Sequence, residues 1–309
     1  MDNKFRLITR SDFDGLVCAV LLKRLDMIDE IKFVHPKDMQ DGKIDVTQKD
    51  ISTNLPYVEG IHLSFDHHES ETIRNQGQHD NHIIDPDAPS AARVVWKHYG
   101  GNDAFPADWD EMMEAVDRGD SAQFNLQQVL SPRNWDLLNF LMDARTGLGR
   151  FREFRISNYD LMMDLIDYCK DNRIDDIMKL PDVVERIDLY REQSEQFKQQ
   201  IMRCAKIYDN LVVLDLRNEV VIHAGNRFII YALYPQCNIS IHAMWGRDHQ
   251  NTVFATGKSI FDRSSKTNIG ELMLRYGGGG HQAAGTCQVD NDNAEQVLQE
   301  LIAAINADQ

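Results

Sequence analysis

Apolar runs of strand length alternate with helical stretches along the first hundred residues. The runs that predict strands are 5–9, 31–34, 50–53, 61–65 and 82–84. A helix is predicted over 16–25, and another begins near Pro89 and stops before Gly100. This alternation favours an α/β domain built on a mostly parallel sheet.

The pattern then becomes mainly helical from 109 to about 205, and a long polar helix begins at Asp182. Its many charged positions indicate a solvated helix, which suits a connector between domains. Strand-like runs resume at 211–216, 220–223, 239–244 and 252–256, followed by a helix within 294–304. We therefore predict three parts: an α/β domain with a helical extension over 1–181, a connector helix over 182–206, and a smaller α/β domain over 207–309.

Composition narrows the class of protein. With 309 residues, 42% of them hydrophobic, the chain is long enough for two cored domains. Its five cysteines are scattered without a CxxC pair, which argues against disulfides and zinc–thiolate sites and indicates reduced thiols. The first residues lack a basic and then apolar leader, and no apolar run approaches the roughly 18 residues of a membrane span. We expect a cytoplasmic protein without a membrane segment.

The charge of the chain bears on its partners. A net charge of −16 repels long polyanions, because non-specific nucleic-acid binding depends on phosphate neutralisation by a basic surface. Long duplex DNA is therefore excluded as a partner. A few cations and backbone N–H groups around a bound metal can still form a local positive pocket, so the expected ligand is a short phosphorylated molecule.

Acidic and histidine side chains follow two of the predicted strands. Asp12 and Asp14 lie in the turn after the first strand, and Asp66-His67-His68 ends the strand 61–65. The carboxyl ends of parallel strands share the ligand-binding edge of a sheet, and mixed carboxylate and imidazole ligands suit Mn²⁺, Zn²⁺ or Fe²⁺. The alternatives are helix capping by the aspartates and a surface histidine pair. Because the histidines follow an aspartate at a strand end, we favour metal binding.

A glycine-rich segment lies far downstream. Gly277, Gly278, Gly279 and Gly280 precede His281, and Ala283-Ala284-Gly285 follows. Four glycines allow close backbone approach and anion-binding turns; a flexible loop or a helix C-cap is the alternative. Upstream, Lys258, Ser259 and Arg263 offer the cations and hydroxyl that phosphate or ribose contacts need, although an ordinary solvated loop would look the same.

These motifs give the chain a resemblance to a known family over nearly its whole length. It resembles the DHH phosphoesterases, in the branch with a DHHA1 second domain and with oligoribonuclease-like and exopolyphosphatase-like members. Residues 8–15 resemble the acid-rich first motif, Asp66-His67-His68 the third, and 115–121 with Asp117 the fourth. The segment 277–285 resembles the substrate loop of the DHHA1 domain.

Two positions depart from the family pattern. Arg10 stands where many relatives have histidine, and a guanidinium cannot ligate a metal but can grip a phosphate. The acid of the second motif has no clean counterpart: Asn54 occupies its expected position, with Asp50 as the alternative. Since asparagine is a weaker ligand, the chain is expected to hold one metal tightly and a second weakly, or only with substrate bound.

The resemblance implies a role for each part. Residues 1–181 become a DHH catalytic domain and 207–309 a DHHA1 substrate-binding domain, with the substrate held across the cleft between them. One or two divalent ions, expected to be Mn²⁺, are assigned to Asp12, Asp14, His67, Asp117 and Asn54. His68, Asp66 and Arg10 are assigned to catalysis, with His68 on the reacting phosphate and Asp66 supporting the histidines. The substrate contacts are assigned to Gly277, Gly278, Gly279, Gly280, His281, Lys258, Ser259 and Arg263.

The expected activity is hydrolysis of very short phosphorylated oligonucleotides, especially dinucleotides such as the pGpG-like linear products of cyclic-dinucleotide breakdown. An exopolyphosphatase or a nucleotide 3′-phosphatase remains an alternative, because the same metal centre suits both. A non-catalytic nucleotide sensor is the alternative from another class, motivated by Arg10 and Asn54. The oligomeric state stays open, with a homodimer as one option.

Overall fold

The computed structural model describes residues 4–68, 71–72, 79–151 and 153–308. The chain forms two compact units. The first contains Met1–Phe124 and Pro132–Leu189, and the second contains Asn125–Ser131 and Tyr190–Gln309. The division falls inside one long helix, α10 (Pro181–Cys204), which contributes residues to both units.

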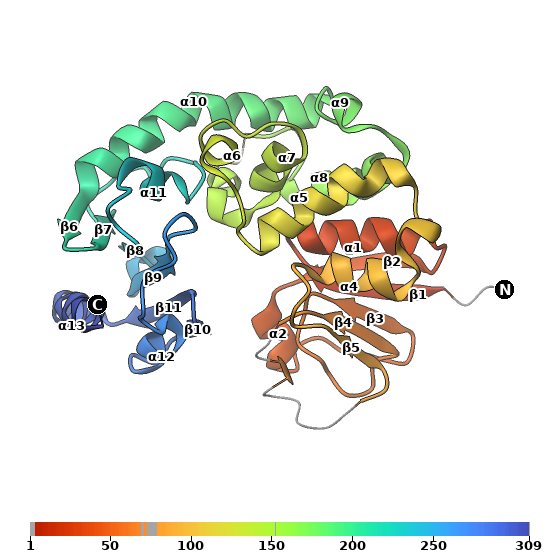
Figure 1. Ribbon diagram of the computed structural model, residues 1–309, viewed down its shortest axis with the longest axis horizontal. Helices are drawn as coiled ribbons and strands as arrows, with labels where there is room; N and C mark the ends of the chain where they lie inside the picture. The colour runs from red at the N-terminus through yellow and green to blue at the C-terminus, as the bar shows by residue number, and fades with distance from the viewer. Residues whose placement is uncertain (1–3, 69–70, 73–78, 152, 309) are drawn as a thin grey trace. The chain divides into compact units, whose positions relative to one another are not determined.

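The first unit is built on a five-stranded sheet in the order β2-β1-β3-β4-β5, and all its strand pairs are parallel (Figure 1). Its central strands are short and buried, as expected for a parallel sheet covered on both faces. The strands are β1 (Phe5–Arg10), β2 (Ile28–Val34), β3 (Asp50–Thr53), β4 (Leu63–Asp66) and β5 (His82–Ile84).

Helix α1 lies at the centre of the first unit. It packs against β1 and against α4, α5 and α8, and ten of its residues are buried because it is apolar on nearly every side. The helices with described bounds that belong wholly to this unit are α1 (Phe13–Arg24), α2 (Pro36–Gln40), α4 (Ala91–His98), α5 (Asp110–Asp120), α7 (Asn134–Met142), α8 (Asn158–Asp171) and α9 (Ile174–Ile177).

The second unit contains a six-stranded mixed sheet in the order β10-β11-β9-β8-β7-β6, in which only β7 and β8 run parallel. Its core joins the sheet to α12 and α13 through residues such as Ile241, Phe254 and Leu301. The elements are α6 (Leu126–Leu130), β6 (Ala205–Tyr208), β7 (Leu211–Asp215), α11 (Ile229–Leu233), β8 (Ile239–Trp245), β9 (Thr252–Lys258), α12 (Ile269–Leu274), β10 (Gly279–His281), β11 (Ala284–Val289) and α13 (Ala294–Ala307).

Short 3₁₀ turns complete the chain: Gly101–Asp103, Ala107–Trp109, Ala144–Thr146, Leu148–Arg150, Arg247–His249 and Asn291–Asn293. No helix in the described ranges is both long enough and apolar enough to cross a membrane.

The α/β fold class is confirmed, with a parallel sheet in the first unit and a separate sheet in the second. The strand predicted over 220–223 is wrong: this segment has no ladder partner, and Val220 is fully exposed. β6 and β10 were not predicted, because β6 continues directly from a helix and β10 is mostly glycine. The domain limits at 181 and 206 remain predictions.

Candidate metal centre

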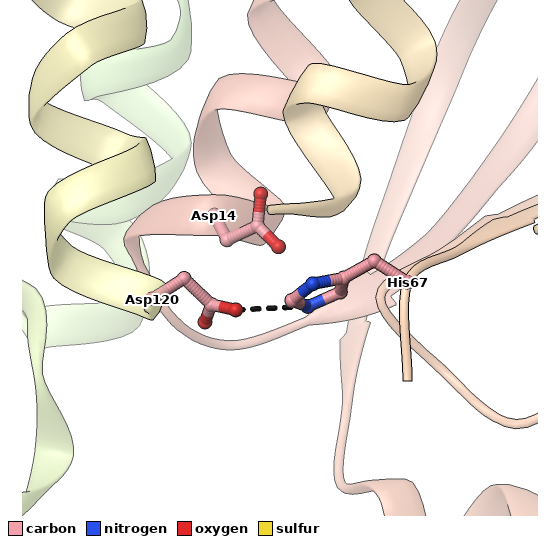
Figure 2. A group of neighbouring side chains, drawn as sticks. All are labelled: Asp14, His67 and Asp120. Atoms are coloured by element: carbon pink, nitrogen blue, oxygen red, sulfur yellow. Dashed lines mark ion pairs between the residues drawn. The ribbon is translucent and has the colours of Figure 1, made fainter. Parts of the chain in front are cut away.

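Three side chains from distant parts of the first unit converge on one point (Figure 2). Asp14 lies in the first turn of α1, His67 follows β4, and Asp120 is the last residue of α5. Each offers one ligand atom, and these atoms all lie within 4.8 Å of one another. Two carboxylates and one imidazole at this spacing form a set that a divalent transition metal can bind.

Asp14 is held by the start of α4. Its carboxylate accepts hydrogen bonds from the backbone N–H groups of Ala91 (3.0 Å) and Ala92 (2.8 Å), and a helix N-terminus favours negative charge. Burial nevertheless dominates: together with the nearby charge of Asp120, it raises the pKa of Asp14 to about 8. A cation at this point would restore the charged carboxylate.

His67 is oriented as a metal-binding histidine. Its Nδ1 lies 3.1 Å from the carbonyl oxygen of Ala88, so Nδ1–H donates there and the lone pair of Nε2 is directed toward the carboxylates. Nε2 is buried and lies 2.8 Å from Asp120 Oδ2, with which it forms an ion pair when the ring is protonated. Burial opposes a charged ring, but Asp120 outweighs it and raises the pKa of His67 to about 10. The site therefore favours a positive charge at Nε2, supplied either by a proton or by a metal ion.

Asp12 has a different environment from Asp14. It is the N-cap of α1, because its Oδ1 accepts from the backbone N–H of Gly15 at 2.9 Å. Its Oδ2 lies 2.9 Å from Arg10 Nε, and Asn54 donates to Oδ1 from Nδ2 at 3.2 Å. Asp12 lines the same pocket as Asp14, but its oxygens already have these partners. Asp50, the alternative acid of the second motif, pairs instead with Arg6 at 2.7 Å.

Asp66 organises the histidine turn. It is fully buried, and its Oδ1 accepts from the backbone N–H of His67 (2.8 Å) and from Nδ1 of His68 (2.7 Å). Burial opposes a charged His68 ring, but the bond to Asp66 outweighs it and raises the pKa of His68. The structure thus brings Asp66, His67 and His68 to the predicted sheet edge, with Asp66 behind the histidines.

Asp117 lies one turn before the end of α5 and has other partners. Its Oδ1 accepts from the hydroxyl of Ser90 (2.7 Å) and its Oδ2 from Nε of Arg93 (2.8 Å), both on or next to α4. The structure therefore brings Asp120, and not Asp117, next to Asp14 and His67. The sequence carries a signal for Asp120, because it stands in the same motif, 115–121, as Asp117.

A pocket in the first unit adjoins the centre: Asp14 and Asp120 line it, together with residues that were not assigned to the metal, to catalysis or to the substrate. One of them is Arg145, whose Nε is 2.8 Å from Asp143 Oδ1. The pocket is lined by Asp12, Phe13, Asp14, Val116, Gly119, Asp120, Asn139, Asp143 and Arg145.

The glycine segment of the second unit forms a tight hairpin. A side chain at Gly278 would lie 2.2 Å from the carbonyl oxygen of Thr286, and one at Gly280, where φ is +155°, would lie 2.3 Å from that of Ala284. The fold itself therefore requires these two glycines. A side chain at Gly279 would meet nothing within 4 Å, and its φ is not positive, so the fold does not explain that glycine.

The neighbouring polar residues have structural partners. Lys258 donates from Nζ to the carbonyl oxygen of Ser265 at 3.0 Å. The hydroxyl of Ser259 is buried and accepts from the backbone N–H groups of Phe261 and Asp262. Of the other members of the predicted substrate set, Arg263, Gly277, Gly280 and His281 are exposed, and Gly278 and Gly279 are half-buried.

Solved structures, and not family models, relate this chain to known proteins. No protein-family model matches the sequence, and neither does any curated protein. Among solved structures, the chain is 66% identical to the pGpG-specific phosphodiesterase PggH from Vibrio cholerae, over 99% of this chain and 100% of that one, with a TM-score of 0.86.

Two remote structures share the fold alone. The DHH domain of a protein described as belonging to a family of ribosomal proteins is 12% identical, over 98% of this chain and 86% of that one, with a TM-score of 0.59. RecJ from Thermus thermophilus in complex with Mn²⁺ is 11% identical, over 98% of this chain and 52% of that one, with a TM-score of 0.55. With 66% identity to one phosphodiesterase over its full length, and with the fold of DHH-domain proteins, the chain belongs to the DHH family of phosphoesterases.

Proposed function

We propose that this protein is a metal-dependent phosphodiesterase that hydrolyses pGpG and related very short phosphorylated oligonucleotides. The observation that carries the proposal is the convergence of Asp14, His67 and Asp120 in a chain 66% identical to a pGpG-specific phosphodiesterase. The net charge of −16 fits a short substrate better than a long polyanion.

Asp14, His67 and Asp120 would hold one divalent ion, and we propose Mn²⁺. The buried Nε2 of His67, which faces the carboxylate of Asp120 at 2.8 Å while Nδ1 is directed at a backbone carbonyl, fits a metal ligand. Burial raises the pKa of Asp14, and a bound cation would restore the charged carboxylate, so Asp14 also fits a metal ligand. Such an ion lowers the pKa of a bound water and neutralises charge on a phosphate. The Mn²⁺ complex of a RecJ with the same fold makes this ion the first one to test.

Hydrolysis of pGpG adds the elements of water across the P–O3′ bond. The water oxygen joins phosphorus, the 3′ oxygen leaves with a proton, and two guanosine 5′-monophosphates form. We assign His68 to the reacting phosphate, because Asp66 holds its Nδ1 at 2.7 Å and fixes the ring. Asp66 is then a positioning residue.

We further propose that the second unit binds one end of the substrate. Gly279 supports this role, because neither clash nor positive φ explains its missing side chain, and close approach of a ligand to the backbone would. Exposed Arg263 and His281 would supply polar contacts to phosphate or ribose. A cytoplasmic location is part of the same proposal, since a cytoplasmic enzyme would meet cyclic-dinucleotide products there.

A substrate and metal screen tests the proposal. Wild-type protein, His67→Ala, Asp120→Ala and the exposed control Asp108→Ala are assayed with pGpG, pApA, a nucleoside 3′,5′-bisphosphate and inorganic polyphosphate, each with Mn²⁺, Mg²⁺ or Co²⁺. We expect pGpG turnover by the wild type and the control, and its loss in both site variants. Preferred turnover of polyphosphate or bisphosphate would replace the substrate assignment, and tight pGpG binding without turnover under every metal would indicate a sensor.

A further inference from the structure

The charged residues that line the pocket beside the metal centre are four aspartates and one arginine, Arg145. We propose that Arg145 contacts the non-bridging oxygens of the scissile phosphodiester and so is a further catalytic residue of this enzyme. The inference rests on the proposed function and adds to it a residue outside the Asp-His-His turn and the aspartate motifs.

The first support is how Arg145 is held. It lies in the 3₁₀ turn Ala144–Thr146, and Asp143 is the N-cap of that turn. The same oxygen of Asp143 accepts from the backbone N–H of Arg145 at 2.9 Å and from its Nε at 2.8 Å. The guanidinium is therefore fixed at its base, while neither Nη group has a hydrogen-bond partner among the described residues.

The second support is exposure. The Arg145 side chain is 56% exposed, whereas the Asp143 side chain that holds it is only 12% exposed. Two N–H groups on one side of a planar guanidinium match two oxygens of a phosphate. Arg145 lines the pocket, and its two Nη groups suit bidentate phosphate binding.

The third support is the charge of the pocket. Its carboxylates belong to Asp12, Asp14, Asp120 and Asp143, and they exceed the charge of one divalent ion by two. Arg145 supplies one of the missing positive charges, and Arg10, which lies 2.9 Å from Asp12, supplies the other. An anionic phosphodiester would otherwise enter a pocket of its own sign, which costs free energy.

Steady-state kinetics with pGpG and Mn²⁺ test the inference on four proteins: wild type, Arg145→Ala, Arg145→Lys and the control Arg173→Ala, which removes an equal charge from an exposed position of the same unit. We expect kcat/KM to fall about 100-fold in Arg145→Ala, the typical effect of removing one preorganised donor to a developing oxyanion. Arg145→Lys should recover only a small part of the lost kcat/KM, because a lysine ammonium is a point charge and lacks the parallel N–H donors of a guanidinium. The control should match the wild type.

Mn²⁺ affinity, measured by electron paramagnetic resonance, separates substrate contact from pocket structure. Arg145→Ala should bind Mn²⁺ at least as tightly as the wild type, because a repelling cation is removed. Weaker Mn²⁺ binding, activity within twofold of the wild type, or full rescue by lysine would each overturn the inference.

A generic diester, bis(p-nitrophenyl) phosphate, separates this inference from the proposed function. If the wild type cleaves the generic diester but not pGpG, the proposed substrate is refuted and the Arg145 comparison is made on the generic diester. If the wild type cleaves neither with any of the three metals, both proposals are overturned.

Discussion

Asn54 occupies a backbone conformation that few residues tolerate and donates its amide hydrogens to Asp12. Its φ is +56°, a region that asparagine enters more easily than most residues. Its Nδ2 lies 3.2 Å and 3.4 Å from the two oxygens of Asp12. The residue that departs from the family's second motif is thus a donor that steadies a neighbouring aspartate.

The variant Asn54→Asp tests this role. An aspartate cannot donate to Asp12 and adds a like charge, so we expect the free energy of unfolding without metal to fall by about 1–3 kcal/mol. Added Mn²⁺ should recover more stability in the variant than in the wild type, because the new carboxylate is a ligand. Thermal unfolding with and without Mn²⁺ measures both effects. Asn102→Asp, at an exposed position, is the control, and a metal-free variant as stable as the wild type would contradict this reading.

The site residues differ in how far the sequence could predict them. Asp14 and His67 could be predicted as site residues from their positions after predicted strands, because the ends of parallel strands meet at one sheet edge. Asp117 and Asp120 are three residues apart on α5 and share a helix face, so only the packing of α5 against α4 decides which reaches the centre. Arg145 stands in a basic stretch with Arg150 and Arg155, which suggests a cleft residue or an internal ion pair, and no periodic pattern links its 3₁₀ turn to a distant aspartate.

At the scale of elements, α4 supports Asp14 with its first turn. Ser90 caps α4 by accepting from the backbone N–H of Arg93 at 3.0 Å, and Asp117 accepts from the side chains of both. The amide of Ala91 that holds Asp14 therefore belongs to a turn that α5 fixes. Asp117 acts on the centre through this turn.

We expect Asp117→Ala to weaken Mn²⁺ affinity about 10- to 100-fold, the usual cost of losing a group that orients a metal ligand. Isothermal titration calorimetry with Mn²⁺ measures it. The matched control is Asp136→Ala, which removes another ion pair of α5, to Arg118 at 2.9 Å, without contacting α4. If both variants lose stability and neither loses Mn²⁺ affinity, Asp117 is only a structural residue.

Strand β3 begins with an ion pair that makes stability depend on pH. Burial would raise the pKa of Asp50, but Arg6 and the N–H and hydroxyl of Thr47 outweigh it and hold the pKa below the usual 3.8. A depressed folded pKa adds stability above the unfolded value, and this stability is lost as the pH falls through the folded value.

Asp50→Asn should therefore lower the free energy of unfolding by about 1–3 kcal/mol at pH 7, and the difference from the wild type should shrink below about pH 4. Urea unfolding at a series of pH values measures this difference. Asp108→Asn, at an exposed position, should show no such dependence, and a difference for Asp50→Asn that stays constant down to about pH 3 would refute the assignment.

The elements themselves were largely predictable where hydrophobic periodicity is strong. The five strands of the first sheet and the helices α1 and α13 follow from apolar runs, and α10 follows from a long polar helical pattern. The segment 220–223 looks like a strand but is a loop, because its backbone hydrogen bonds go to a side chain: Gln200 on α10 accepts from the N–H of His223 and donates to the carbonyl oxygen of Val221. Local propensity cannot foresee such tertiary partners.

At the scale of the whole molecule, the metal centre belongs to one unit. Asp14, His67 and Asp120 all lie in the first unit, and each lies on or next to a different element: α1, β4 and α5. The second unit has its own core, in which Ile241, Phe254 and Leu301 join sheet and helices. A bound ion should therefore stabilise the first unit directly and leave the core of the second unchanged.

Hydrogen exchange with and without Mn²⁺ checks this division of stability. At a free concentration about one hundred times the dissociation constant, a ligand of the folded state adds about 2.7 kcal/mol. Amides of β1, β3 and α1 that exchange through unfolding of the first unit should then slow about 100-fold. Amides of β7 and β8 should keep their rates, and His67→Ala should abolish the difference. Equal slowing in both units would mean that they unfold as one cooperative body. Slowing in neither unit would refute the assignment of the metal to Asp14, His67 and Asp120.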